Sequence, residues 1–84
     1  MSDDRTPVTP DAVWPEDTED PEALLVDWYV AEGAEVEEGE SLCTIQVEKV
    51  DADVPAPAAG TVAEIAVQED DVCTREDTLA WIES

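Results

Sequence analysis

The clearest question of chemistry in this chain concerns its single lysine, Lys49. The 84 residues include 24 aspartates and glutamates but only 3 basic residues, and the other two are arginines. Acidic residues surround Lys49, namely Glu48, Asp51 and Asp53. A catalytic or Schiff-base lysine needs the opposite surroundings, because burial or cationic neighbours make its amine nucleophilic. These neighbours favour a passive role for Lys49, and the alternative is an ordinary solvated lysine in a turn.

No other side chains form a pattern typical of catalysis or metal binding. The chain has no histidine and no cysteine pair at metal-ligand spacing, so we predict no metal site and no catalytic residue. Cys43 and Cys73 leave two alternatives, a redox pair or two small core residues. Neither has a basic residue directly beside it in sequence that would lower its thiol pKa, which favours the core.

The formal net charge of −21 excludes some classes of partner. Like charge repels nucleic acid and anionic membranes, so we expect neither as a partner. Disorder is one alternative explanation of the charge, but 43% hydrophobic residues with strand-like periodicity argue against it. Adaptation to high salt is the other, since molar salt screens dense surface carboxylates. With no signal peptide pattern and no long apolar run, we expect one small domain in a halophilic cytoplasm.

The chain contains an internal repeat at an offset of 37 residues, which matches residues 25–46 with residues 62–83 without gaps. The matched pairs are Leu25 and Val62, Trp28 and Ile65, Val30 and Val67, Val36 and Cys73, Leu42 and Leu79, and Ile45 and Ile82. In the same alignment Cys43 matches Ala80. Two copies are too few for a solenoid. They predict two halves related by a pseudo-two-fold axis, each covering the apolar face of the other.

The repeated segments are short and have the periodicity of strands. Val26, Trp28 and Val30 alternate with Asp27, Tyr29 and Ala31, as in a half-buried strand. Residues 45–47 and 50–54 continue in the same manner, and Lys49 falls between them at the tip of a predicted tight hairpin. No stretch has a helical apolar stripe. The chain is therefore predicted to be all-β, an antiparallel sandwich or barrel.

At this hairpin the chain resembles the lipoyl domains of 2-oxoacid dehydrogenase complexes, within the biotinyl/lipoyl-carrier superfamily. Such domains have a glycine ten residues before the modified lysine and another eleven residues after it, and Gly39 and Gly60 meet both spacings. Residues 32–45 follow the family pattern EGDxVxxGxxLxxI except at Ala34, and residues 54–60 follow VPxPxxG. The resemblance covers residues 12–84 and leaves residues 1–11 as a flexible acidic N-terminal segment.

The resemblance implies a flattened barrel of two antiparallel sheets, with the lysine at one end and the chain termini at the other. It implies that Lys49 carries lipoate through an amide bond, so that the domain is a swinging-arm carrier and not an enzyme. Glu48 and Val50 are the expected recognition residues for a lipoate ligase or lipoyl transferase. The further partners would be 2-oxoacid dehydrogenase, acyltransferase and dihydrolipoamide dehydrogenase components.

The chain departs from the family pattern at several places. The usual tripeptide around the lysine is Asp-Lys-Ala, and here it is Glu48-Lys49-Val50. Asp70 and Glu76 stand where the second half has glycines, so reshaped turns are expected there. Val13-Trp14-Pro15 resembles the opening strand, but an acidic loop follows it. The repeat offset also places Ala12 at the position that matches Lys49.

Two alternative functions and two contexts stay open at this point. A biotin carrier is the first alternative, although biotin carriers usually place methionine on both sides of the lysine and the only methionine here is Met1. The second is an unmodified β-barrel that serves as an interaction module. The chain is expected to be either a free-standing carrier or one domain of a longer acyltransferase.

Overall fold

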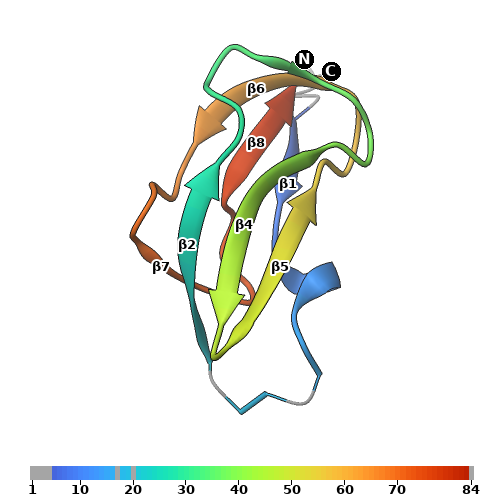
Figure 1. Ribbon diagram of the computed structural model, residues 1–84. Coiled ribbons are helices and arrows are strands. Elements are labelled where there is room, and N and C mark those ends of the chain that lie inside the picture. Colours follow the sequence, from blue (N-terminus) through green and yellow to red (C-terminus); the bar gives the residue numbers. More distant parts are fainter. Residues whose placement is uncertain (1–4, 17, 20, 84) are drawn as a thin grey trace.

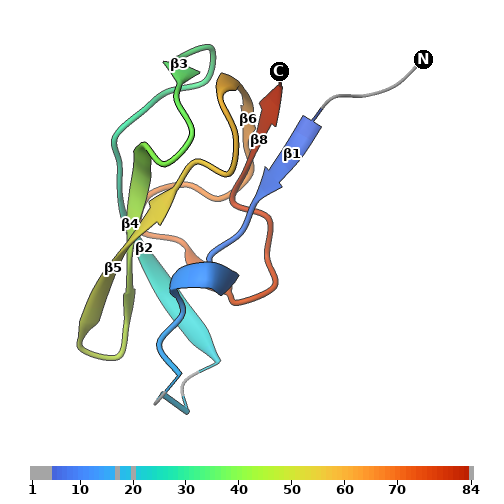
Figure 2. The same ribbon diagram turned by 90° about the vertical axis from the view of Figure 1, so that its right-hand side faces the viewer.

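The strands pair into two four-stranded antiparallel sheets that pack face to face (Figures 1 and 2). The computed structural model describes residues 5–16, 18–19 and 21–83. Sheet A has the order β1-β8-β6-β3, formed by Arg5–Val8, Ala80–Glu83, Gly60–Ile65 and Glu35–Val36. Sheet B has the order β5-β4-β2-β7, formed by Val50–Pro55, Ser41–Val47, Glu22–Trp28 and Val72–Thr74. The predicted all-β fold of two antiparallel sheets is confirmed.

The core lies between the sheets and is built from the inward positions of both halves of the repeat. Leu25, Leu42 and Ile45 of the first half and Leu79 and Ile82 of the second are at most 1% exposed. Alternation along the strands points these side chains inward. No helix among the described residues is long and apolar enough to cross a membrane.

The predicted pseudo-two-fold axis is visible in matched pairs of hydrogen bonds between the halves. The Gly33 amide donates to the Val62 carbonyl at 2.7 Å, and the Asp70 amide donates to the Leu25 carbonyl at 2.8 Å. Gly33 and Asp70 are 37 residues apart, as are Leu25 and Val62. Each half therefore closes the turn of the other with the same bond.

The two glycines that meet the family spacing have different physical roles. Gly39 has a φ of +88°, in the left-handed region that side chains disfavour. Gly60 lies so close to β8 that a Cβ atom there would meet the Glu83 carbonyl oxygen at 2.5 Å. One glycine therefore serves a turn and the other serves a close strand approach.

The turns at Asp70 and Glu76 differ in how they replace glycine. Asp70 keeps the left-handed conformation of its counterpart Gly33, with φ +70° against +91°, because aspartate tolerates this region better than most residues. Glu76 does not have a positive φ, so this turn is reshaped relative to that at Gly39, as expected. It still keeps the same internal bond, in which the Thr74 amide donates to Asp77 Oδ2 at 2.9 Å.

The N-terminal region corrects two expectations from the sequence. The first strand is β1, Arg5–Val8, and not Val13–Pro15; Asp11–Val13 forms a 3-10 helix, η1. Residues 5–8 are therefore part of sheet A and not of a flexible segment, whereas residues 1–4 lie outside the described residues. Val8 is the one fully buried side chain of β1. Pro7 occupies an exposed position of the strand, which is tolerated because β1 is at the edge of sheet A.

The same strand corrects the predicted counterpart of Lys49. Thr6 of β1 pairs with Ile82 just as Ala52 of β5 pairs with Ile45. The axis thus relates β1 to β5, and Ala12, which lies in η1, is not the equivalent of Lys49. β1 begins beside the end of β8, at the end of the molecule opposite the β4–β5 hairpin (Figure 1).

Candidate modification site

Lys49 lies at the tip of the hairpin between β4 and β5, as predicted. Val47 pairs with Val50, so the loop consists of Glu48 and Lys49 alone. Both loop residues are exposed. A two-residue loop fixes the direction of the tip tightly, because the ladder begins again immediately on both sides.

Glu48 adopts an unfavourable backbone conformation next to the lysine. Its φ is +58°, and among the described residues only Asp70 is another non-glycine residue with positive φ. A positive φ at the first loop residue but not at the second is the pattern of a type II′ turn, which normally has glycine first. Glutamate at this position is strained, and such strain is often found at functional sites.

The Lys49 amine is open to solvent and to modification. The ion pairs within the described part of the chain join Arg5 to Glu64 and Glu83 and Arg75 to Asp11, and none involves Lys49. A lysine held in an ion pair would have to leave its partner before it could be acylated. The hairpin therefore presents an amine that needs no rearrangement of the domain.

A chain of hydrogen bonds links side chains across sheet B, a few residues from the tip of the hairpin. Thr44 Oγ1 donates to Asp53 Oδ1 at 2.8 Å, and the Tyr29 hydroxyl donates to Thr44 Oγ1. The three residues belong to β4, to β5 and to the segment after β2, so the chain ties three neighbouring segments of sheet B. Sequence reasoning missed this network: Thr44 and Asp53 are paired by the hairpin register, but Tyr29 comes beside Thr44 only through the β2–β4 register, which shifts at a bulge between Leu25 and Asp27.

The two cysteines are core residues, as the repeat indicated. Both are fully buried and unpaired. Burial raises the pKa of the Cys43 thiol to about 12, with further contributions from the charges of Cys73 and Asp53. Burial likewise raises the pKa of the Cys73 thiol to about 11, with a smaller contribution from Asp77. The thiolate is the reactive form, so these thiols are unreactive at neutral pH.

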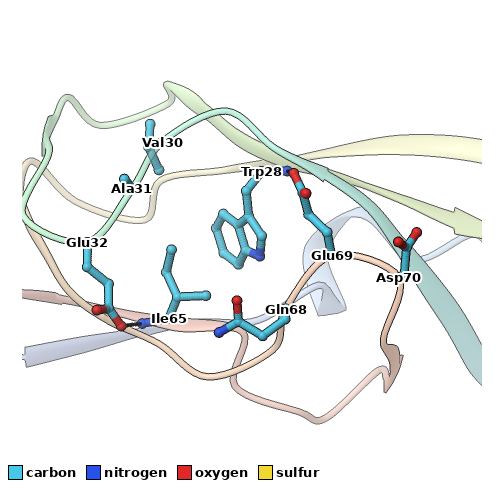
Figure 3. A pocket seen from close by; sticks show the side chains of 8 residues that line it. All are labelled: Trp28, Val30, Ala31, Glu32, Ile65, Gln68, Glu69 and Asp70. Atoms are coloured by element: carbon cyan, nitrogen blue, oxygen red, sulfur yellow. Dashed lines mark hydrogen bonds between the residues drawn. The ribbon is translucent and has the colours of Figure 1, made fainter.

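An open cavity of about 680 Å³ lies on the pseudo-two-fold axis and not at the hairpin. Trp28 and Ile65, which are repeat partners, stand at its centre (Figure 3). Glu32 Oε2 accepts from the Ile65 amide at 2.8 Å, and Glu69 Oε2 accepts from the Trp28 amide at 3.0 Å. The carboxylates of Glu32 and Glu69 therefore hold the two halves of the domain together. No group of acidic, cysteine or histidine side chains within the described residues could hold a metal ion.

Comparison with known proteins places this geometry in a family. The family model described as "Biotin-requiring enzyme" (Biotin_lipoyl) matches residues 15–82. The chain is 42% identical over 50 residues to the dihydrolipoyllysine-residue acetyltransferase component of the pyruvate dehydrogenase complex of Corynebacterium glutamicum. It is 33% identical over 63 residues to the component of the same name from Staphylococcus aureus. These matches cover 60% and 75% of this chain, but only 7% and 15% of the two relatives.

A solved structure supports the same assignment. The lipoyl domain of the 2-oxoglutarate dehydrogenase complex from Azotobacter vinelandii superposes with a TM-score of 0.68 at 26% sequence identity. The superposition covers 86% of this chain and 89% of that domain. The chain therefore belongs to the Biotin_lipoyl family and has the fold of a lipoyl domain, a carrier domain that is not itself a catalyst.

Proposed function

We propose that Lys49 is the lipoyl attachment site and that the domain is a swinging-arm carrier of a 2-oxoacid dehydrogenase complex. The observation that carries this proposal is the position of the only lysine, exposed at the tip of a two-residue hairpin in a member of this family. Lipoate is favoured over biotin because both named relatives and the solved neighbour are lipoyl proteins by name. The hairpin also lacks the methionines expected beside a biotinyl lysine.

The protein's own contribution is to anchor and present the arm. Lipoate, when attached, supplies a dithiolane that accepts an acyl group and two electrons. The hairpin holds the attachment point away from the core, and the Tyr29–Thr44–Asp53 network stiffens the strands that support it. The partners that such a carrier serves are 2-oxoacid dehydrogenase, acyltransferase and dihydrolipoamide dehydrogenase components.

A lipoate ligase or lipoyl transferase must recognise the hairpin, and we infer that it reads Glu48 and Val50. The Val50 side chain is 49% exposed beside the tip. The left-handed backbone of Glu48 determines where its carboxylate stands relative to the lysine. The two residues therefore present a defined acidic and apolar pair on either side of the acceptor amine.

The proposal is tested by incubating the domain with a lipoate ligase, ATP and lipoate and measuring its intact mass. The native chain should gain one lipoyl group and Lys49→Arg should gain none. A matched control, Glu38→Lys in the Lys49→Arg background, places a single lysine in another exposed turn and should stay unmodified. Lipoylation of Lys49→Arg would overturn the assignment, because only the α-amine remains there. Lipoylation of the control would show that the ligase does not read the hairpin.

A further inference from the structure

The exposed apolar side chains of this domain are distributed unequally between its two sheets. All five large apolar residues that are exposed in the described chain belong to sheet B or to the residue following one of its strands. They are Leu24 and Val26 of β2, Tyr29 just after β2, Val50 of β5 and Val72 of β7. Within the described residues, sheet A has no exposed large apolar side chain.

Three of these residues form a continuous surface, which we term the β2–β7 patch: Leu24, Val26 and Val72. They are 37%, 37% and 56% exposed. Leu24 pairs directly with Val72 across the two strands, so their Cβ atoms are about 5 Å apart. Val26 follows on β2, where the bulge between Leu25 and Asp27 turns it outward. Sequence alternation had predicted Val26 on the same face as the half-buried Trp28, and the bulge is the reason that it is not.

The pseudo-two-fold axis provides an internal reference for this patch. The residues at the equivalent positions of sheet A are Thr61, Ala63 and Glu35, each 37 residues from its counterpart. Glu35 pairs with Thr61 in sheet A just as Val72 pairs with Leu24 in sheet B. The same backbone therefore accepts polar and small residues at these positions, and folding alone does not require the apolar ones. Contiguous exposed apolar residues commonly mark interaction sites.

The patch lies on the sheet that carries the modification site. Leu24 pairs with Gln46, which is three residues before Lys49, a separation of about 10 Å along a strand. β2 begins near the hairpin end of sheet B and runs antiparallel to β4, away from the hairpin (Figure 1), so that Leu24 lies on the part of β2 close to the hairpin. A protein bound to the patch would therefore sit beside the root of the arm.

Charge decides which kind of partner fits. Asp27 lies on β2 beside the patch, and Asp51 and Asp53 lie on β5 in the same sheet. The described arginines are in ion pairs, Arg5 in sheet A and Arg75, which follows β7, with Asp11 of η1. A second copy of this chain would present the same acidic residues around the same patch, so the two faces would not be complementary in charge. The complementary surface is an apolar contact ringed by lysine and arginine.

We propose that the β2–β7 patch is the docking surface for the 2-oxoacid dehydrogenase component that loads the arm, and that this enzyme presents such a basic-ringed apolar contact. The proposal rests on the proposed function of Lys49. Loading determines which carrier is used by a given complex, so a contact between proteins at this step would confer specificity that the arm alone lacks.

Docking is tested in a competition assay. The 2-oxoacid dehydrogenase component acylates the lipoylated domain, and Lys49→Arg, which carries no arm, is added as a competitive inhibitor. The patch variant Leu24→Thr/Val26→Ala/Val72→Glu, made in the Lys49→Arg background, copies the residues of sheet A onto sheet B. We expect its inhibition constant to rise by about tenfold or more, as for removal of a central apolar contact. In the lipoylated domain the same changes should raise KM with little effect on kcat. Acylation of free lipoamide should not change.

The mirror variant Glu35→Val/Thr61→Leu/Ala63→Val moves the apolar residues to sheet A and should leave the inhibition constant unchanged. An unaltered constant in the patch variant overturns the proposal. The proposal is also overturned if the native chain is a dimer in sedimentation and the patch variant is a monomer. It is overturned as well if the patch variant loses lipoylation but still inhibits, because the patch would then belong to the ligase. Circular dichroism checks the fold, and Leu24→Thr alone replaces the triple variant if that does not fold. The two failures are distinguishable: if the Lys49 assignment is wrong, no lipoylated substrate forms, whereas failure of the docking proposal gives an unaltered inhibition constant with that substrate present.

Discussion

At the scale of single residues, the proposed acceptor Lys49 is ordinary and its neighbour Glu48 is not. Lys49 is exposed and outside any ion pair in the described chain, whereas Glu48 has a left-handed backbone at a position that a type II′ turn reserves for glycine. A strained glutamate that is kept beside the acceptor is most simply explained by what its carboxylate presents to a modifying enzyme.

Glu48→Gly should therefore stabilise the fold while it impairs lipoylation. Relief of a left-handed conformation is worth about 1–2 kcal/mol, and the greater freedom of glycine in the unfolded chain offsets about half of it. We expect the free energy of unfolding to rise by about 0.5–1 kcal/mol in denaturant titrations. Asp51→Gly, in the adjoining strand, is the control and should destabilise by a similar amount. A loss of stability in Glu48→Gly would contradict the strain argument.

The buried thiols should make stability depend on alkaline pH. Burial raises the pKa of Cys43 and Cys73 in the folded state to about 12 and 11, above the ordinary value of 9.0. Above pH 9 the unfolded chain loses protons that the folded chain retains, so unfolding is favoured as the pH rises toward 11. The free energy of unfolding should fall by roughly 1 kcal/mol per pH unit for each thiol. Cys43→Ala/Cys73→Val, which copies the repeat counterparts, should remove this slope, and a slope that persists there would have another cause.

At the scale of elements, the two halves are held together by reciprocal bonds across the axis. Glu32 accepts from the Ile65 amide of β6, and Glu69 accepts from the Trp28 amide of β2 (Figure 3). Both amides point to the side of their strand where the neighbouring strand has ended, because β7 pairs only with Glu22–Leu24 of β2 and β3 only with Gly60 and Thr61 of β6. The carboxylates satisfy these donors in the other half.

Glu32→Ala should therefore destabilise the domain by about 1 kcal/mol, because it removes the acceptor of a half-buried amide. Glu69→Ala should cost a similar amount, since it is the repeat counterpart, and Glu32→Gln should cost less because it keeps an oxygen acceptor. Glu38→Ala removes the same charge from an exposed turn and is the reference for urea titrations in molar KCl. Equal stability of Glu32→Ala and Glu38→Ala would show that the bond contributes nothing.

The sequence predicted those elements that the repeat preserves. The strands that contain Leu25, Leu42, Ile45, Val62 and Ile82 follow the offset of 37 residues, and the hairpin follows from the valines around Glu48-Lys49. β1 was missed because it is related to β5 by a different offset, which the longer N-terminal loop creates. The exposure of Val26 and the network at Thr44 were also missed, because both depend on bulges that leave no mark in the sequence pattern.

At the scale of the whole molecule, the charge of −21 on 84 residues is the dominant physical feature. Most of it must lie on the surface of a domain with a small core, where mutual repulsion opposes folding. We propose that the protein functions in a cytoplasm of high salt, where this repulsion is screened.

Thermal stability should accordingly rise steeply with KCl. A small domain is stable by only about 5–15 kcal/mol, so unscreened repulsion of a few kcal/mol is a large share, and molar salt reduces the screening length to about 3 Å. Lys49→Arg should show the same salt dependence, because the effect comes from the surface as a whole. A midpoint that does not change from dilute buffer to molar KCl, followed by circular dichroism, would contradict the proposal.

The most direct test of the central claim, that Lys49 carries lipoate, is the intact mass of the protein isolated from its native cells, followed by mapping of the modified peptide. We predict one added lipoyl group, located on the peptide that contains Glu48-Lys49-Val50, and no addition in a strain that expresses Lys49→Arg. An unmodified mass in cells that use lipoate, a biotinyl mass, or a lipoyl group on any other peptide would contradict the account.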